Sequence, residues 1–393
     1  MKILKLLLGA GSGHLIAITL TPFFMSVYSP ENFGEYALYI ALSGLLLGFS
    51  CLRFDAVILV CKSSEVLQVF KTGIAFNLLL LGLVFVIAKS MNYPQIYFFL
   101  VSLFGQSLLL ISSSLFLRFD NYLLVSILKF IFTAGIPIFQ LIITITFKEN
   151  GLIIGHFLAS LLLITILIYY LTQHFKWPNT HKVKILSKYS DFYTINTPSV
   201  LLNSLSSQFL PISINFFFGE AVLGAINVLQ RVFITPVTFT LRIVLQFYNK
   251  EITTMINVKA YANAYQFLLK TMTLSLVSTI IFVGISSFLF DYFKQTHYFQ
   301  GEWSKITNYF FPFLVLLVIQ GTTIPISQTL TFIHKHSLQL RIELLRILLL
   351  SFLVIAFLIN NYGAEKFINI FILVQSTIYI VLTAKIIQTF KRL

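Results

Sequence analysis

The feature that most constrains this chain is a series of long apolar stretches that follow one another along its whole length. A helix needs about 20 apolar residues to cross a bilayer. Stretches of that size lie at about 4–27, 34–60, 71–89, 95–117, 122–147, 151–172, 192–218, 221–248, 264–290, 306–333, 338–360 and 366–389. They predict an all-α integral membrane protein with about twelve transmembrane helices.

The composition agrees with a membrane protein. Hydrophobic residues make up 58% of the chain and charged residues 10%, whereas soluble domains have roughly 45–50% and 25%. The net charge of +14 could indicate nucleic-acid binding. We exclude that class because the charges are spread through short connections between apolar stretches and do not line one soluble face.

The distribution of basic residues predicts the orientation. With a cytoplasmic N-terminus, the cytoplasmic segments hold seventeen Lys and Arg: Lys2, Lys5, Lys62, Lys71, Arg118, Lys176, Lys182, Lys184, Lys188, Lys250, Lys259, Lys270, Lys335, Arg341, Lys385, Lys391 and Arg392. The opposite face holds five: Lys89, Lys148, Lys294, Lys305 and Lys366. Basic residues favour the cytoplasmic side. We therefore expect both termini in the cytoplasm and the first apolar stretch to be retained as a helix.

The two halves of the chain resemble each other around their first two predicted helices. Gly34 precedes Arg53 by 19 residues, and Gly224 precedes Arg242 by 18. The repeat predicts a six-helix half at 1–172, a basic cytoplasmic linker at 173–191 and a second six-helix half at 192–393. Halves with an even number of helices share their orientation, and transporters built this way hold their cargo between the halves. We expect the halves to surround a central cavity.

Three segments carry a family resemblance. They are Leu20-Thr21-Pro22 with Tyr28-Ser29-Pro30-Glu31-Asn32-Phe33-Gly34-Glu35-Tyr36-Ala37, then Arg53-Phe54-Asp55-Ala56-Val57-Ile58-Leu59, and finally Leu223–Pro236 with Val244–Tyr248. Together they resemble bacterial polysaccharide-repeat flippases of the O-antigen, Wzx type. These belong to the multidrug/oligosaccharidyl-lipid/polysaccharide exporter superfamily.

The resemblance implies a function in the bacterial inner membrane. Such flippases move an undecaprenyl-diphosphate-linked oligosaccharide by alternating access for O-antigen or capsule synthesis. They work beside a polysaccharide polymerase and a chain-length regulator, and transport can be coupled to a gradient of H⁺ or Na⁺. No other cofactor is expected, and the only other partners are membrane lipids.

Cations inside the apolar stretches are the candidate cargo-binding residues. Arg231 lies roughly 15 Å into its stretch, near the middle of a hydrocarbon core about 30 Å thick. An arginine at that depth normally faces a partner or a wet cavity. Arginine also forms paired hydrogen bonds with phosphate oxygens. Arg53 and Arg242 lie nearer the predicted cytoplasmic boundary, where snorkelling to the interface is the simpler explanation.

Further candidates are weaker. Lys129 and Arg346 lie about two turns from the cytoplasmic face, with Glu343 a neighbour of Arg346 at i,i+3. Asn227 and Gln230 could recognise sugar hydroxyls, although amides in membrane helices more often bond between helices. Asp55 is two residues from Arg53, so the two would not share a helix face directly.

Two other functions compete with the flippase. A cation-coupled drug or metabolite exporter of the same superfamily would use buried carboxylates, of which the chain has few: Glu35, Asp55 and Asp120. A membrane enzyme would need catalytic residues in a large external loop, and no connection here is long enough. His334 and His336 flank Lys335 at a helix end, where an interfacial position is the simpler reading than proton coupling.

Overall fold

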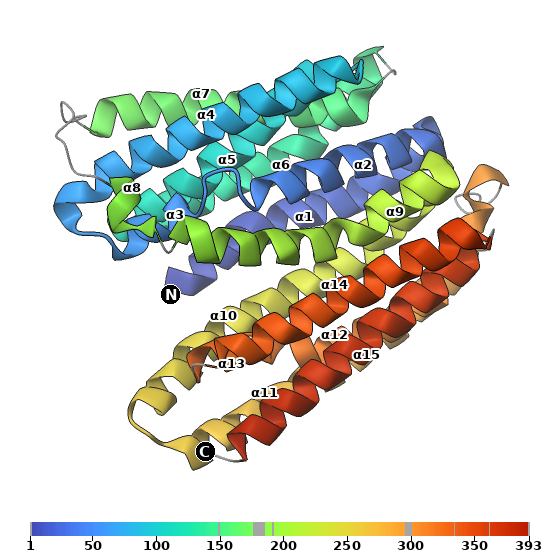
Figure 1. Cartoon of the computed structure of the whole chain (residues 1–393). Coiled ribbons are helices and arrows are strands. Elements are labelled where there is room, and N and C mark those ends of the chain that lie inside the picture. The colour runs from blue at the N-terminus through green and yellow to red at the C-terminus, as the bar shows by residue number, and fades with distance from the viewer. Residues whose placement is uncertain are drawn as a thin grey trace. The chain divides into compact units, whose positions relative to one another are not determined.

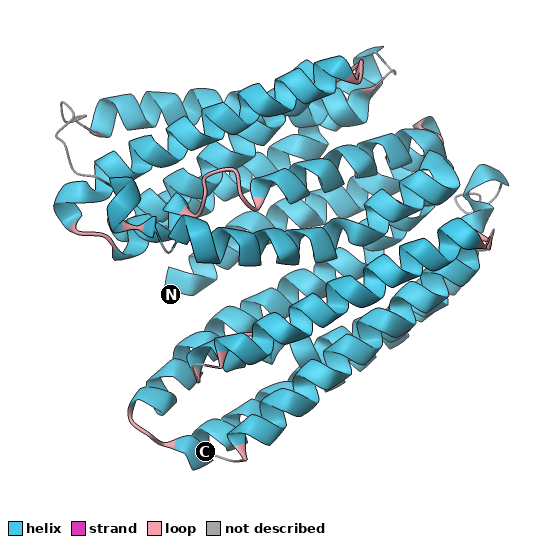
Figure 2. Cartoon of the chain, in the orientation of Figure 1, coloured by secondary structure: helices cyan, strands magenta, loops and turns pink. Residues whose placement is uncertain are grey.

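A computed structural model describes residues 2–147, 150–175, 185–190, 192–294, 301–333, 335–360 and 362–391. Every regular element in these ranges is helical (Figure 2). The predicted linker 173–191 lies largely outside them, because residues 176–184 and 191 are among those not described. The same holds for His334 and for the side chain of His336.

The chain forms the following helices, labelled in Figure 1. Its first part contains α1 (Lys2–Val27), α2 (Pro30–Leu47), α3 (Phe54–Val60), α4 (Val66–Ser90), α5 (Ile96–Arg118), α6 (Tyr122–Phe147) and α7 (Gly151–His174). The remainder contains α8 (Ile185–Lys188), α9 (Thr197–Leu229), the π-helical turn η3 (Gln230–Ile234), α10 (Thr235–Asn257), α11 (Tyr261–Lys294), α12 (Ile306–Thr323), α13 (Thr329–Phe332), α14 (His336–Ile359) and α15 (Ala364–Phe390).

These helices confirm the predicted membrane fold. By length and composition, nine helical segments of the described chain could cross a membrane. One of them, Val200–Ile256, covers the seventh and eighth predicted spans, which are separated at Gly219, where φ is 80°. α1 matches the first predicted span, and the pair α2–α3 matches the second. Each predicted span therefore corresponds to helix in the structure.

Two spans predicted as continuous helices are interrupted. The stretch 34–60 breaks between α2 and α3, where Leu52 and Arg53 adopt left-handed φ values of 44° and 63°. The stretch 306–333 breaks between α12 and α13, at a short 3₁₀ turn that begins at Ile324 and contains Pro325. Proline lacks the backbone N–H that a continuing helix needs. A hydrophobicity pattern cannot reveal either break, because the residues on both sides remain apolar.

The chain divides into two compact units. The first contains residues 1–27 and 35–208, and the second contains residues 28–34 and 209–393. In the first, α3, α4, α5, α6 and α7 surround an apolar core that includes Phe54, Ile111 and Leu163. In the second, α10, α11, α14 and α15 share a core around Tyr248, Leu268 and Ile386. The six-helix halves of the sequence repeat remain a prediction beside this division.

The repeat-related glycines meet inside the second unit. A Cβ atom on Gly34 would overlap the carbonyl group of Glu220, and one on Gly224 would overlap the carbonyl oxygen of Pro30. Both overlaps involve backbone, which cannot swing aside as a side chain can. Glycine is therefore required at both positions for the segment 28–34 to pack this closely on α9.

Candidate functional site

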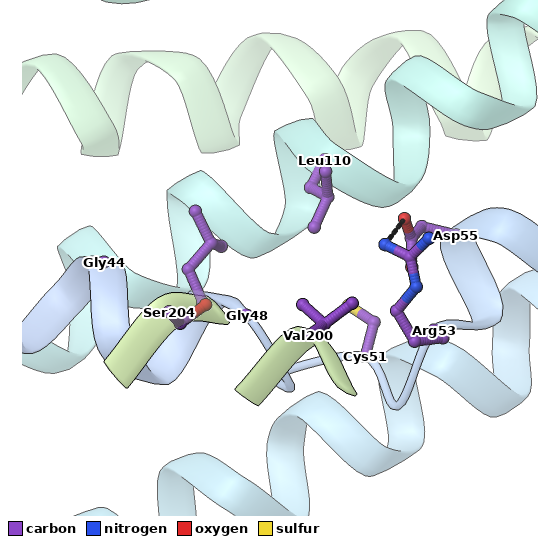
Figure 3. Close-up of a pocket in the computed structure, with 9 residues that line it drawn as sticks. Gly44, Gly48, Cys51, Arg53, Asp55, Leu110, Val200 and Ser204 are labelled. Carbon is purple, nitrogen blue, oxygen red and sulfur yellow. Dashed lines mark hydrogen bonds and ion pairs between the residues drawn. The ribbon is translucent and has the colours of Figure 1, made fainter. Parts of the chain in front are cut away.

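A pocket of about 260 Å³ lies in the first unit where the second span is interrupted (Figure 3). Its walls come from the end of α2, from the break that follows, from α5 and from α9. The lining residues are Gly44, Leu47, Gly48, Cys51, Arg53, Asp55, Leu110, Val200 and Ser204. The volume is below the roughly 300–1,000 Å³ of pockets that hold drug-sized ligands. It suits a headgroup better than an entire oligosaccharide.

Close packing between α2 and α9 shapes one wall. Gly44 near the end of α2 and Gly48, just after it, face Gln208 and Ser204, which lie one turn apart on α9. A Cβ atom on Gly48 would overlap the Ser204 hydroxyl. Small residues at i and i+4 let membrane helices approach closely, and here they bring a hydroxyl to the edge of the pocket.

Arg53 and Asp55 supply the charge of the pocket. Arg53 occupies the N-cap position of α3 with a left-handed backbone (φ 63°, ψ 13°). Its Nη1 lies 3.4 Å from Oδ2 of Asp55. The expectation that these residues would not share a face is wrong, because Arg53 lies outside the helix and its backbone conformation turns the side chain towards Asp55. Figure 3 shows the guanidinium directed at the carboxylate.

The Arg53 guanidinium keeps donors that Asp55 does not use. The 3.4 Å contact is longer than the roughly 2.7–2.9 Å of a strong charge-assisted bond. Arg53 Nε is buried and makes no hydrogen bond to another described residue. A buried donor without a partner costs about 1–3 kcal/mol. The Arg53 guanidinium in the pocket lining is therefore incompletely paired among the described residues.

The other predicted binding residues lie outside this pocket. In the first unit, Lys129 is half-buried on α6. In the second, Asn227, Gln230 and Arg231 are half-buried at the end of α9 and the start of η3. Arg242 is exposed on α10. Arg53 is thus the one predicted binding residue that lines this pocket.

Arg346 has its own neighbours within the second unit. Its Nη1 lies 3.5 Å from Oε2 of Glu343, which confirms the predicted i,i+3 contact. The guanidinium carbon also lies 5.5 Å from the ring centroid of Tyr379 on α15. The ion pair and the aromatic face offset part of the cost of burying this side chain, which is 10% exposed. Its Nε, like that of Arg53, is buried without a hydrogen-bond partner among the described residues, but Arg346 does not line the pocket.

Sequence reasoning missed most of the pocket's lining. The spacing of Gly44 and Gly48 matches the small-xxx-small pattern of close helix contacts and could have indicated a crossing at α2. Cys51 lines the pocket as well, and its place in an apolar stretch carries no signal beyond that of a small apolar residue. Ser204 carried no signal of its own, because its role depends on which helix crosses α2.

The fold resembles that of known transporters. The sequence matches no protein-family model and no curated protein. A multidrug resistance MATE family transporter of the MOP superfamily, in an inward-facing conformation, has a TM-score of 0.66 and 12% identity, over 97% of this chain and 96% of that one. A MATE protein in complex with MaL6 has a TM-score of 0.65 and 12% identity, over 100% and 97%.

A third similar structure is a transporter from Pyrococcus furiosus. It belongs to the MOP superfamily and is described as having a binding pocket of reverse polarity, which suggests a different function for that protein. Its TM-score is 0.60 at 14% identity, and the match covers 99% of this chain and 96% of that one. At such low identity the likeness concerns architecture. The chain has the fold of MATE-type transporters of the MOP superfamily.

Proposed function

We propose that this protein is a transporter that flips an undecaprenyl-diphosphate-linked oligosaccharide across the bacterial inner membrane by alternating access. The observation that carries this proposal is the incompletely paired Arg53 guanidinium in the lining of the pocket. A diphosphate is anionic and accepts the planar, paired hydrogen bonds that arginine donates. The fold supports a membrane transporter, and the family resemblance of the sequence favours this cargo.

The pocket is large enough for only one part of the proposed cargo. A volume of about 260 Å³ accommodates a phosphate group or one sugar but not a whole repeat unit. Arg53 would hold the diphosphate, and Ser204 would donate to a phosphate or sugar oxygen at the pocket edge. The glycan would occupy the predicted cavity between the halves, and the polyprenyl tail would stay in the lipid.

Asp55 has a defined part in this proposal. Without cargo, its carboxylate balances the Arg53 charge and orients the side chain. A phosphate that forms two shorter bonds to the guanidinium would replace this 3.4 Å contact. The arginine would then exchange one anionic partner for another and would never be left unpaired in a low-dielectric site.

A cation-coupled drug exporter is the second candidate. Two observations favour it: the described multidrug resistance activity of a similar structure, and the Asp55 carboxylate, which is only 11% exposed in the pocket. A carboxylate could bind a coupling cation or a cationic drug. The alternatives differ in the charge of the group that the pocket recognises.

Flipping measured in proteoliposomes separates the two. The purified protein is reconstituted with an undecaprenyl-diphosphate oligosaccharide, and an impermeant enzyme that modifies the sugar reports which leaflet it occupies. We expect the protein to accelerate flipping of this lipid and not of a neutral glycolipid with the same sugar. Cation-driven uptake of a cationic dye, with no flipping of either lipid, would contradict the proposal and support the exporter.

Surface polysaccharide provides the cellular counterpart. In a host that lacks its own flippase, the protein should restore polysaccharide export when the cognate repeat unit is made. A host polymerase and chain-length regulator, the proposed partners, would then assemble the exported units. Restoration with a matched membrane level of protein, but not with Arg53→Ala, would tie export to the pocket.

A further inference from the structure

A hydrogen-bonded cluster inside the first unit takes no part in the proposed cargo site. His156 on α7 lies between Tyr36 on α2 and Gln106 on α5. The Tyr36 hydroxyl is 3.2 Å from Nδ1 of the imidazole, and Nε2 of Gln106 is 3.3 Å from its Nε2. His156 and Tyr36 are each 4% exposed. Three helices thus hold one titratable ring away from lipid and water.

Aromatic rings complete the surroundings of the imidazole. The ring centroids of Tyr36, Tyr39 and Phe132 lie 6.0, 5.6 and 5.7 Å from that of His156. The ring planes meet that of the imidazole at 63°, 67° and 79°, so all three contacts are edge-to-face. Aromatic surface therefore surrounds the imidazole and contributes to its burial.

Formal charges near the imidazole are few among the described residues. On α2, the carboxylate of Glu35 accepts a hydrogen bond from Gln95. On α6, the cation is Lys129, three residues before Phe132. On α5, Arg118 lies twelve residues beyond Gln106, or roughly 18 Å along the helix. The titratable side chains that contact the ring are Tyr36, whose hydroxyl lies against Nδ1, and Tyr39, whose hydroxyl donates to the carbonyl of Phe98.

Both hydrogen-bond partners of His156 can serve either protonation state. A neutral imidazole has one N–H donor and one acceptor nitrogen, whereas an imidazolium has two donors. A tyrosine hydroxyl donates or accepts. A glutamine amide can rotate to present its oxygen in place of its nitrogen, and the two orientations are nearly indistinguishable in most structures. Uptake of a proton would thus require only the rotation of two side-chain groups.

We propose that His156 is a proton-binding site that couples protonation to the conformational change of this protein. In the structure, the ring of His156 is buried, and an imidazolium there would have no carboxylate partner among the described residues, which is unfavourable. A conformation that admits water to the site would bind the proton more tightly. A difference in proton affinity between two conformations is what couples proton binding to their equilibrium.

The position of the cluster fits such an exchange. His156 is five residues from the start of α7 and Tyr36 is six from the start of α2, or about 8–9 Å from those helix ends. The orientation predicted from basic residues places both ends on the external side. A small separation of α2 from α7 would connect the imidazole to external water. The inference rests on the proposed transport function.

Hydrogen exchange of the full-length protein in lipid nanodiscs, without cargo, provides the test. Peptides that cover the starts of α2, α5 and α7 are followed from pH 8 to pH 5.5, after correction for intrinsic exchange rates. In the wild-type protein, we expect the opening equilibrium of these peptides to rise on acidification, by up to about tenfold per pH unit for one proton. His156→Gln, which keeps an amide but binds no proton, should abolish this rise.

A matched control lies on the same helix. His174 is exposed on α7, where its ring stacks on Tyr170 with centroids 4.0 Å apart. His174→Gln should keep the wild-type pH dependence. If His156→Gln also keeps it, or if wild-type exchange does not depend on pH, the proposal is overturned.

A second variant covers the case in which His156→Gln does not fold. Tyr36→Phe keeps the aromatic ring and removes the hydroxyl that would accept from the imidazolium. We expect it to shift the midpoint of the pH dependence to lower pH, and an unchanged midpoint would overturn the proposal. Because no cargo is present, failure here would leave the flipping experiment untouched. If the peptides open in a pH-dependent way but the protein does not flip the lipid, the proposed cargo would be contradicted while the proposal for His156 would stand.

Discussion

The two repeat-related regions share a spacing but differ in structure. In the first, the chain from Gly34 to Arg53 leaves the helical conformation, and Arg53 lines a pocket beside Asp55. In the second, the chain from Gly224 to Arg242 remains helical through η3 and α10, and Arg242 is exposed. The same residue type, at distances from the glycine that differ by one residue, thus acquires two environments.

Local backbone chemistry accounts for the difference. Before Arg53, the chain contains Gly48 and Ser50, and the Ser50 hydroxyl donates to the carbonyl of Leu47, which competes with the helix. Before Arg242, the Thr240 hydroxyl donates to the carbonyl of Pro236 within a continuous helix. The comparison teaches that a repeat can fix where a cation lies along the chain while the break beside it determines whether it can bind.

The largest expected effect concerns the shared orientation of the two regions. Reporter fusions after residues 30, 92 and 220 should read as external, and fusions after 66, 180 and 393 as cytoplasmic, because basic residues favour the cytoplasmic side. Opposite readings at 180 and 393 would mean that the second region is inverted relative to the first, and the comparison of the two arginines would fail.

A second test concerns the glycines that begin the two regions. Gly224→Ala should destabilise the protein by about 1–3 kcal/mol, because the added Cβ would overlap the Pro30 carbonyl. Gly284→Ala on α11 is the matched control, since no atom lies within 4 Å of its added Cβ. Thermal unfolding in detergent measures both. Equal stability of the two variants would show that the crossing of the glycines is looser than it appears.

A smaller effect is expected at Asp55. Asp55→Asn removes a carboxylate that competes with phosphate for Arg53, so binding of an undecaprenyl-diphosphate lipid should tighten by a few-fold. The ion pair is partly exposed, and its loss should cost about 1 kcal/mol or less of stability. A binding titration beside a measurement of protein level distinguishes the two effects. Normal protein levels with transport abolished would instead indicate that Asp55 binds a coupling cation.

The apolar pattern was sufficient for the fold. The length of the apolar stretches located the spans, because the thickness of the bilayer fixes the length of a spanning helix. The break at 48–53 was missed, because the length of an apolar stretch does not report the left-handed φ values at Leu52 and Arg53. Gly48 and Ser50 did not reveal it, since small residues are also common where membrane helices pack together. The Arg53–Asp55 pair was missed for the same reason, since helical spacing separates the two side chains and the break reunites them.

The buried cluster around His156 shows a different limit. His156 is a lone histidine near the start of an apolar stretch, which is a visible signal in the sequence. The sequence analysis considered only His334 and His336, near a helix end, for proton coupling. The partners Tyr36 and Gln106 come from stretches 120 and 50 residues away in the chain. Only the packing of α2, α5 and α7 reveals that they meet.

The central claim is that Arg53, and not its repeat partner Arg242, binds the anionic headgroup. The most direct measurement is the affinity of the purified protein in nanodiscs for a soluble diphosphate oligosaccharide headgroup, compared between Arg53→Ala and Arg242→Ala. Charge-assisted hydrogen bonds contribute about 1.5–3 kcal/mol, so Arg53→Ala should weaken binding about tenfold to a hundredfold. Arg242→Ala should change it less than about twofold, as expected for an exposed side chain. Equal losses in both variants, or unchanged binding in Arg53→Ala, would contradict the account.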